Sequence, residues 1–407
     1  MKILLVNKFH YIKGGSETFY FSLADALEKM GHQVIYFSMK DENNRLCRQN
    51  KYFISHVQKD GTVCEKIKFV MNVKYNVEAY KKMTLLLADE EPDLVVLNLI
   101  HKQISLSVID AIKDFKKKRI PIFWVMHELS CVCPAYTMLN GKGQVCEKCL
   151  HGDFKNCVKY KCLHESRFMS YLAYKEAKYN KSRQVYDLVD LYICPSIFYK
   201  NKLTEAHFTK SKIIYLSNLL SIDYKYEKSN GVKDYLLYLG RLSKEKGIFT
   251  LIDAIKTTKK HLIILGTGPL ESELKSYVKN LGLETNIEFL GFKKGKELEN
   301  YVKEAKAVIL PSEWYENCPY SAMEALAKGK PLIVSNLGGL PEFVDDGKNG
   351  FIFLAGDSDS LVSKINDLFK LSAFEYSEFE NYSLNKAKQT FLAENYVQKI
   401  IGYAKDF

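Results

Sequence analysis

Short apolar runs alternate along the chain with longer segments in which apolar residues recur every three or four positions. Short apolar runs between turn residues are typical of buried parallel strands, whereas the longer periodic segments are typical of helices. The alternation predicts an α/β fold with parallel sheets covered by helices on both faces. The predicted strands are Lys2–Asn7, a strand opened by Gly31–Val34, Leu94–Leu97, Ile122–Met126, Leu191–Cys194, Tyr235–Leu239, His261–Leu265, Ile287–Leu290, Ala307–Leu310 and Leu332–Ser335.

Length and composition allow two such sheets. The 407 residues, 47% of them apolar, can build two Rossmann-sized domains with full cores. The segment Ser221–Lys233 is polar and charged and lacks periodicity, which is typical of an interdomain linker. We therefore expect one domain over 1–218, a second over 219–390 and a final helical segment over 391–407.

No segment of the sequence is suited to export or membrane insertion. The first apolar run is interrupted at Asn7 and Lys8, too early for a signal peptide, and no later stretch reaches the length of a membrane helix. We expect a cytoplasmic protein, whose ten cysteines are thiols or metal ligands rather than disulfides.

The positive charge lies in the first half of the chain. Residues 1–200 hold 31 Lys and Arg against 21 Asp and Glu, whereas the remainder holds 28 against 27. A basic half suits nucleic acid, an anionic membrane or acidic substrates. The lysines are scattered and no nucleic-acid motif accompanies them, so an ordinary soluble surface and docking on anionic lipid at the inner membrane face stay open.

The stretch after Leu310 carries the most specific candidate chemistry. Glu316 and Glu324 lie eight residues apart, and the helix formers of Ser321–Lys328 end at Gly329. Glu316 would then lie on the loop that enters a helix, with Glu324 about two turns along the same face. Such a pair is usually only a solvated face. With backbone N–H groups at the helix start between them, the two carboxylates suit a sugar and a ribose.

The neighbours of these glutamates form one ordered pattern of strand, ligand loop, helix, strand and glycine turn. The residues that define this pattern are Pro311-Ser312, Gly329-Lys330-Pro331, Gly338-Gly339, Glu342 and Gly350. The stretch resembles the signature of the retaining glycosyltransferases of family four, which have the GT-B fold of two Rossmann-like domains facing a cleft. The resemblance implies an acceptor-binding first domain, a donor-binding second domain and a last helix, Phe391–Lys405, that crosses back to the first.

For the second domain, the resemblance implies the residues that bind a nucleotide-sugar. Arg241 and Lys246, five apart around a strand-to-helix turn, would hold the diphosphate, because arginine offers a planar fork and lysine a point charge. This pair of cations, here called the diphosphate clamp, would stabilise the leaving diphosphate in place of a divalent metal, so no cofactor is expected for catalysis. Glu324 would hold the ribose and Glu316 the sugar. The other implied donor contacts are Asn317, Cys318 and Pro319 after Glu316, Gly266 and Gly268 in a glycine turn, and Phe292 near the base.

In the first domain, Gly14 and Gly15 follow the first strand and open a helix, where a phosphate can approach the backbone. A Gly-Gly pair is more often a simple turn, and the family's glycine loop is what implies the donor diphosphate here. His127 follows the strand Ile122–Met126 directly, at the sheet edge where open α/β sheets bind ligands. The resemblance places it beside the transferred sugar. Glu128 stands where many members of the family have aspartate.

The implied reaction transfers a sugar from a UDP- or GDP-linked donor to a hydroxyl group, with retention of anomeric configuration. The family-level expectation for the acceptor is a lipid-linked intermediate of a bacterial cell-surface polysaccharide. No carboxylate suited to a double displacement is recognisable, so attack on the leaving-group face is our hypothesis. A nucleotide-sugar epimerase or a glycoside phosphorylase would share the fold.

A cysteine-rich insert spans about 131–162 and holds six of the ten cysteines. Cys146, Cys149, Cys157 and Cys162 have a spacing that suits four thiolates around a structural zinc ion. Free thiols and an iron–sulfur cluster are the alternatives. A zinc-bearing nucleic-acid binder would explain the cysteines and the charge, but it would leave the glutamates and the clamp unexplained.

The segment His164–Val189 is expected to form one long helix or two. Phe168, Tyr171 and Tyr174 alternate there with arginine and lysine residues. Such a mixture is typical either of a lipid-facing surface or, more commonly, of an amphipathic helix that packs on the core.

Overall fold

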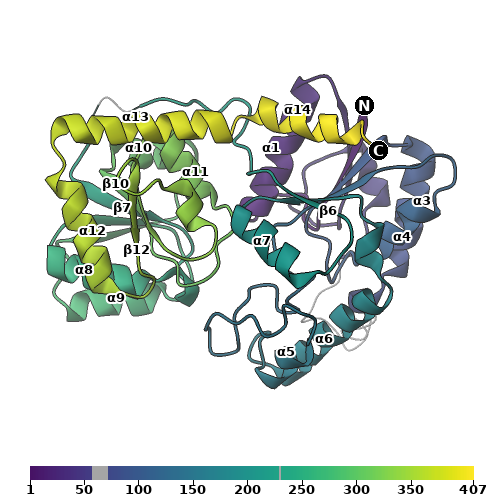
Figure 1. Cartoon of the computed structure of the whole chain (residues 1–407), viewed down its shortest axis with the longest axis horizontal. Coiled ribbons are helices and arrows are strands. Elements are labelled where there is room, and N and C mark those ends of the chain that lie inside the picture. The colour runs from purple at the N-terminus through teal and green to yellow at the C-terminus, as the bar shows by residue number, and fades with distance from the viewer. Residues whose placement is uncertain (57–71, 229–230) are drawn as a thin grey trace. The chain divides into compact units, whose positions relative to one another are not determined.

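The computed structural model describes residues 1–56, 72–228 and 231–407. It divides into two compact units, one formed by Met1–Ile222 with Ala393–Phe407 and the other by Asp223–Leu392 (Figure 1). The boundaries expected from the sequence, after residues 218 and 390, lie four and two residues earlier.

The amino-terminal unit contains a parallel sheet in the order β2-β1-β3-β4-β5-β6. Its strands are β1 (Lys2–Val6), β2 (Gln33–Phe37), β3 (Leu94–Leu97), β4 (Ile122–Val125), β5 (Leu191–Cys194) and β6 (Lys212–Tyr215). Its helices are α1 (Gly15–Lys29), α3 (Val77–Glu90), α4 (Ser107–Asp114), α5 (Lys155–Lys159), α6 (Arg167–Ser182), α7 (Ile197–Ala206) and α14 (Ala393–Ala404), with the 3₁₀ turns η1 (Arg48–Tyr52) and η2 (Val185–Leu188). The strand order reverses between β1 and β3, and open α/β sheets bind ligands at such a switch point.

The carboxyl-terminal unit has a second parallel sheet, in the order β12-β11-β10-β7-β8-β9. Its strands are β7 (Tyr235–Leu239), β8 (His261–Leu265), β9 (Ile287–Gly291), β10 (Ala307–Leu310), β11 (Leu332–Ser335) and β12 (Gly350–Phe353). Its helices are α8 (Ile248–Thr258), α9 (Glu271–Asn280), α10 (Gly295–Glu304), α11 (Tyr320–Ala327), α12 (Ser358–Lys370) and α13 (Ala373–Thr390), with η3 (Lys244–Lys246) and η4 (Leu340–Phe343). This is the Rossmann order, whose switch point lies between β7 and β10.

Most of the strands that the apolar runs predict are buried on both faces, whereas the edge strand β9 has one buried residue. Every residue of β3, β4, β5, β10 and β11 is buried. In the carboxyl-terminal unit, Figure 1 shows α10, α11 and α13 on one side of the sheet and α8, α9 and α12 on the other. Helices on both faces exclude water from the strands, which explains why their sequences are continuously apolar.

Side-chain caps set the starts of several helices. Asn76 accepts a hydrogen bond from the Ala79 N–H at the start of α3, and Ser166 does the same for α6. Ser372 and Glu375 form a reciprocal capping box at the start of α13. Each of these contacts satisfies a backbone N–H group that the helix itself leaves without a partner.

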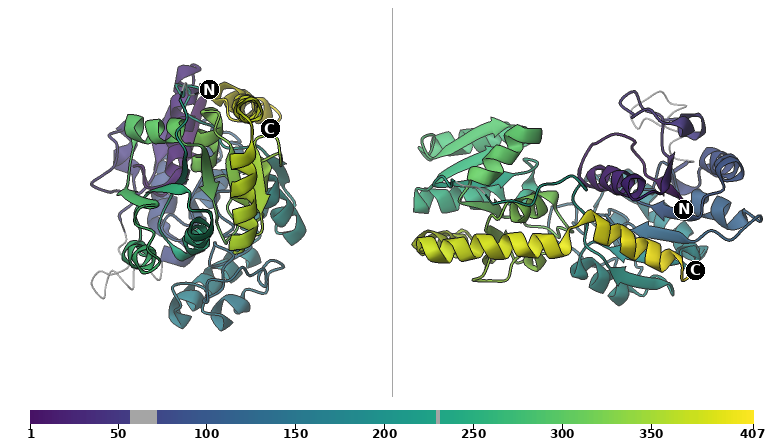
Figure 2. Two further views of the ribbon diagram at one scale, coloured as in Figure 1. Left: turned by 90° about the vertical axis from the view of Figure 1, so that its left-hand side faces the viewer. Right: turned by 90° about the horizontal axis from the view of Figure 1, so that it is seen from above.

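The last helix, α14, belongs to the amino-terminal unit. It packs against α1, where the rings of Phe19 and Tyr396 meet edge to face at 5.5 Å, and the right-hand view of Figure 2 shows the two helices side by side. Across the described part of the chain, no helix combines the length and the apolar composition that crossing a membrane requires.

Candidate active site

The loops that leave β7 and β10 meet at the switch point of the carboxyl-terminal sheet. β7 and β10 are neighbours and run in parallel, so the residues that follow them emerge at one edge. Arg241 and Lys246 follow β7, and Glu316 follows β10. Three residues that the sequence assigns to a donor site are therefore brought to the place where this fold binds ligands.

Lys246 and Glu316 form an ion pair in which the Lys246 Nζ lies 2.5 Å from a Glu316 carboxylate oxygen. The Ser312 hydroxyl donates to the same oxygen at 2.8 Å. Burial by itself raises the pKa of Glu316, but the Lys246 ammonium and neighbouring hydrogen bonds lower it below its ordinary value. Glu316 is thus a buried, ionised group held in one place. Sequence reasoning assigned both residues to the donor but did not foresee that they contact each other.

The turn at Gly338 holds the backbone of Glu316. Gly339 donates its N–H to the Glu316 carbonyl at 2.7 Å. Gly338 has a φ of +63°, and a Cβ atom there would lie 2.5 Å from the Glu316 carbonyl oxygen. Only glycine allows this turn to approach the glutamate so closely.

Replacing Gly338 with alanine is therefore expected to destabilise the protein and to displace Glu316. Gly282 is a matched control, since its φ is +64° but nothing lies within 4 Å of the added Cβ. Gly282→Ala should cost about 1–2 kcal/mol from backbone strain alone, and Gly338→Ala clearly more. Urea unfolding of both variants measures the difference, and equal costs would contradict the packing described.

Arg241 is exposed, and within the described chain no salt bridge engages its guanidinium. The backbone beside it is fixed by two glycines of the loop after β8. A Cβ on Gly266, whose φ is +138°, would lie 1.9 Å from the Gly240 carbonyl oxygen, and one on Gly268 would lie 2.3 Å from that of Leu242. These predicted donor contacts thus have a structural reason of their own, because they let the β7 and β8 loops pack backbone to backbone.

Glu324 lies in the middle of α11, the helix that begins after Pro319. Burial raises its pKa to about 7, an effect that Lys328 opposes and Glu299 adds to. The Lys328 ammonium lies 2.5 Å from Glu299, and within the described residues no salt bridge joins it to Glu324. Glu324 is therefore a half-buried carboxyl that gains charge near neutral pH.

The other predicted donor residues differ in exposure. Asn317 and the buried Cys318 precede α11, and the Cys318 thiol contacts the Met323 sulfur at 3.8 Å. Phe292 follows β9 and is 71% exposed. An exposed ring at the carboxyl edge of the sheet is free to stack on a planar group.

In the amino-terminal unit, His127 follows β4 near the switch point. Its Nε2 lies 3.0 Å from the Asn98 side-chain oxygen, and Phe19 packs edge to face on the ring at 4.8 Å. Burial lowers the pKa of His127 to about 4, although Glu128 opposes this shift. The imidazole is therefore neutral at pH 7.

Gly14 and Gly15 lie where β1 leads into α1. Gly14 is the N-cap residue of α1, with a φ of −169° that any residue can adopt, and Gly15 is the first residue of the helix. Both are exposed. The start of a 15-residue helix carries partial positive charge and suits an anion. The glycines add no side chain of their own to this helix end, where the Glu17 carboxylate already lies in the first turn.

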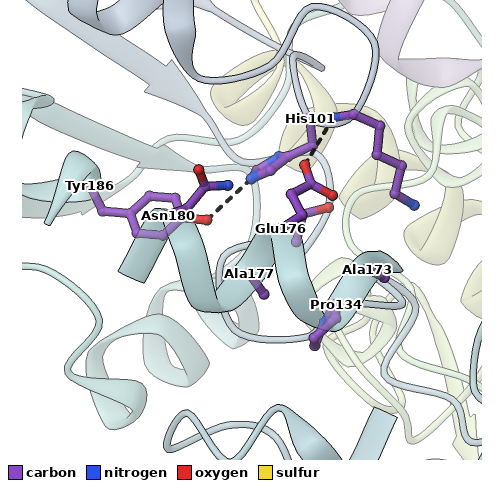
Figure 3. A pocket seen from close by; sticks show the side chains of 9 residues that line it. His101, Pro134, Ala173, Glu176, Ala177, Asn180 and Tyr186 are labelled. Carbon is purple, nitrogen blue, oxygen red and sulfur yellow. Dashed lines mark hydrogen bonds between the residues drawn. The ribbon is translucent and has the colours of Figure 1, made fainter. Parts of the chain in front are cut away.

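A small polar pocket between the β3 loop, the β4 loop and α6 was not foreseen from the sequence (Figure 3). The Lys102 N–H donates to the Glu176 carboxylate at 3.0 Å, and His101 Nε2 lies 3.4 Å from the Tyr186 hydroxyl. Burial raises the pKa of Glu176 to about 7 and lowers that of His101 to about 4. The one available signal was that Glu176 is the only acidic residue of α6.

The cysteines of the insert lie in one neighbourhood. Burial raises the pKa of Cys149 to about 12, and nearby Cys133, Cys162 and Cys146 add to the shift. A hydrogen bond between Cys157 and Cys162 raises the pKa of the first and lowers that of the second. Cys133 thus joins the four predicted zinc ligands. As they stand, no three His, Cys, Asp or Glu side chains among the described residues are placed to hold a metal ion, and the zinc site stays a prediction.

Comparison with known structures identifies the fold. Sucrose-phosphate synthase from Thermosynechococcus elongatus superimposes with a TM-score of 0.70 at 17% identity, covering 100% of this chain and 98% of that one. Anabaena HepE, solved in complex with UDP-glucose, has a TM-score of 0.67 at 18% identity and covers 100% of both chains. The two six-stranded parallel sheets are those of the GT-B glycosyltransferases, as expected from the sequence.

Sequence comparison identifies the family. Residues 223–388 match the family Glycosyl transferases group 1, and residues 13–223 match Glycosyltransferase Family 4. The second match alone spans more than half of the chain, so the chain belongs to glycosyltransferase family 4.

The curated relatives match over parts of their length. The uncharacterized glycosyltransferase MJ1607 of Methanocaldococcus jannaschii is 34% identical over 171 residues, which is 40% of this chain and 42% of that protein. AmsK of Erwinia amylovora, an amylovoran biosynthesis glycosyltransferase, is 31% identical over 31% of this chain and 34% of its own. An uncharacterized protein of the Klebsiella pneumoniae cps region is 25% identical over 84% of this chain and 87% of its own.

Proposed function

We propose that the protein transfers a sugar from a nucleoside-diphosphate sugar to a hydroxyl acceptor. The observation that carries this proposal is the arrangement at the switch point between β7 and β10. There an exposed Arg241 lies in the same loop as Lys246, and Lys246 pairs with the buried carboxylate of Glu316 at 2.5 Å. Two cations and a fixed carboxylate at this edge suit a ligand that combines a diphosphate with hydroxyl groups.

Each donor residue has a distinct role in this proposal. The planar guanidinium of Arg241 would donate hydrogen bonds to the diphosphate. The Lys246 ammonium donates one proton to Glu316 and would donate another to the diphosphate. Glu316, with the backbone of Asn317 and Cys318, would accept hydrogen bonds from the sugar. As the glycosidic bond breaks, negative charge grows on the leaving diphosphate, and the two cations would stabilise it without a divalent metal.

Glu324 would hold the ribose, which predicts a pH dependence of donor binding. Burial raises its pKa to about 7, so the carboxylate that accepts two hydroxyl protons is mostly absent at pH 6 and mostly present at pH 8. Affinity for a nucleotide-sugar should therefore rise about tenfold over this range. The Glu324→Gln variant should bind the nucleotide-sugar weakly, with an affinity that does not change between pH 6 and pH 8. Calorimetric titration at several pH values measures both, and an equally steep profile in the variant would exclude Glu324 as the titrating group.

Names of relatives guide the choice of substrates. HepE was solved with UDP-glucose, and AmsK and WcaL are named for amylovoran and colanic acid biosynthesis. We propose a UDP- or GDP-sugar as donor and a lipid-linked polysaccharide intermediate as acceptor. His127, neutral at pH 7, would contact the transferred sugar as a hydrogen-bond partner rather than as a charge.

We also propose that the anomeric configuration is retained. The acceptor hydroxyl would attack from the face that the diphosphate leaves, and a leaving phosphate oxygen would take its proton. NMR of the product bond decides this point, since an inverted product would rule out attack on that face.

A transfer assay tests the function itself. The protein is incubated with UDP- and GDP-sugars, with and without lipid-linked acceptors, and free nucleoside diphosphate and glycosylated product are measured. Transfer to a hydroxyl group is expected. An epimerase would instead convert the donor, and a glycoside phosphorylase would act on a glycan and phosphate, so either result would replace the proposal.

A structural zinc ion in the cysteine-rich insert is a separate proposal. Its support is the mutual contact of Cys157 and Cys162 and the nearness of Cys133, Cys146 and Cys149. Binding would require the thiols to lose their protons and draw together around the ion. Elemental analysis of the purified protein tests this directly.

A further inference from the structure

Helix α6 turns two of its four aromatic side chains toward solvent. Phe168 is 62% exposed and Tyr171 is 44% exposed. Its buried residues are Ser170, Ala173, Glu176, Ala177 and Asn180. A surface helix normally buries its large apolar residues, so the core-helix interpretation favoured from the sequence is wrong for Phe168 and Tyr171. Large apolar side chains gathered on an exposed face mark an interaction site.

The polar inner face of α6 explains why these rings have no place in the core. Glu176, Ala177 and Asn180 line the pocket of Figure 3. Glu176 accepts the Lys102 N–H there, which fixes the rotation of the helix about its axis. With that face turned inward, Phe168 and Tyr171 must point outward.

The exposed face that carries these rings is also strongly basic. Arg167, Lys175, Lys178 and Lys181 are exposed, and their helical spacing places them on the same side as Phe168 and Tyr171. The single acid of α6, Glu176, is buried on the opposite side. Over residues 140–182 there are nine Lys and Arg against four Asp and Glu, so about half of the net charge of +11 lies in this segment.

A groove runs along the same helix. It has a volume of about 290 Å³ and lies between α6 and the segment Gly152–Lys155. Lys155, Lys178 and Lys181 line it together with the rings of Phe154 and Tyr174. Its one acid, Asp153, accepts a hydrogen bond from Asn156 at 3.0 Å. Figure 2 (left) shows α5 and α6 at the outer edge of the amino-terminal unit.

We propose that this outer face of α6, named here the α6 surface (Arg167, Phe168, Tyr171, Lys175, Lys178 and Lys181), docks on an anionic membrane. The lysines and the arginine would be attracted to the negative lipid surface. The exposed rings would enter the headgroup layer, where aromatic side chains are favoured. The groove would receive a phosphate-bearing headgroup between its three lysines. The α6 surface contains none of the proposed donor residues, so the two proposals stand or fall separately.

Vesicle flotation tests the proposal with the full-length protein. We expect binding to vesicles of 30% phosphatidylglycerol in phosphatidylcholine, little binding to pure phosphatidylcholine, and weakening as salt is raised. Lys175→Glu, Lys178→Glu and Lys181→Glu combined should weaken binding at least about a hundredfold, since each basic residue near the surface is worth about fivefold. Phe168→Ser with Tyr171→Ser should weaken it about tenfold without changing the salt dependence.

The matched control reverses three exposed lysines of the other unit, Lys256, Lys279 and Lys388, and so makes the same change in net charge. It should keep most of the vesicle binding. Thermal shifts with nucleotide-sugars should be the same in all these variants, which separates failure of docking from failure of folding or of the donor site. Undiminished vesicle binding by the α6 triple variant, or preference of the wild type for RNA or DNA over anionic vesicles, would overturn the proposal.

Discussion

Arg241→Ala is expected to lower kcat for sugar transfer by about 10²–10³-fold. Arg241 is exposed at the carboxyl edge of β7, and within the described residues no carboxylate holds its guanidinium. Its free fork would meet the diphosphate, where charge develops as the donor bond breaks. Because the side chain supports no other part of the structure, the free energy of unfolding should change by less than about 0.5 kcal/mol.

Lys244→Ala is the matched control for this variant. Lys244 is exposed in the same loop, three residues from Arg241, and belongs to the turn η3. Like Arg241→Ala, Lys244→Ala removes one positive charge that attracts the donor from a distance. Unlike Arg241→Ala, it removes no direct contact with the diphosphate. Steady-state kinetics of both variants at fixed ionic strength would measure the difference. If both lowered kcat equally, Arg241 would act only through the general field of the loop, and the clamp would be refuted.

Glu316→Gln is expected to reduce both activity and stability. The amide keeps the shape of the side chain but removes the charge that Lys246 contacts at 2.5 Å and that Ser312 supports at 2.8 Å. Losing a charged hydrogen bond in a mostly buried site should cost about 1.5–3 kcal/mol of unfolding free energy. Because the amide no longer fixes the position of the Lys246 ammonium and accepts hydrogen bonds from the sugar more weakly than a carboxylate, kcat should fall about a hundredfold. Glu313→Gln is the control, since Glu313 lies in the same loop but accepts from the neutral Thr250 hydroxyl.

A second substitution separates the two effects of Glu316. Lys246→Met in the Glu316→Gln background removes the unpaired ammonium and should restore part of the stability, but none of the activity. Acid unfolding gives an independent check. The pKa of Glu316 is lowered in the folded protein, so its contribution is present above the ordinary value of 4.5 and is lost as pH falls through the lowered pKa. In Glu316→Gln, the free energy of unfolding should lack this part of its decrease at acid pH. An unchanged decrease in the variant would mean that the Lys246–Glu316 pair does not stabilise the fold.

The sequence predicts most reliably the strands that the fold buries on both faces. Leu94–Leu97, Leu191–Cys194 and Ala307–Leu310 have the predicted bounds because each is an uninterrupted apolar run inside a sheet. β6 (Lys212–Tyr215) was not predicted, since it is an edge strand with two exposed residues and no such run. Apolar runs predict every strand in the interior of the two sheets, but only two of the four edge strands, because β2 and β9 were predicted whereas β6 and β12 were not.

Contacts at the candidate site were less predictable than its residues. Arg241, Lys246 and Glu316 are identifiable from motifs, but the contact between Lys246 and Glu316 joins positions 70 residues apart. It exists because β7 and β10 are neighbours in the sheet, and apolar periodicity does not specify strand order. The same holds for α6, whose rotation is fixed by Glu176 in the pocket and not by its own apolar pattern.

The most direct test of the account is a thermal titration of the purified protein with UDP- and GDP-sugars. We predict that at least one donor raises the melting temperature by several degrees at saturating concentration, since ligand at 100 times its Kd stabilises the folded state by about 2.7 kcal/mol. The shift should be largely lost in Arg241→Ala. If no nucleoside-diphosphate sugar changed the melting temperature of the wild-type protein, the donor site proposed at the β7–β10 switch point would be wrong.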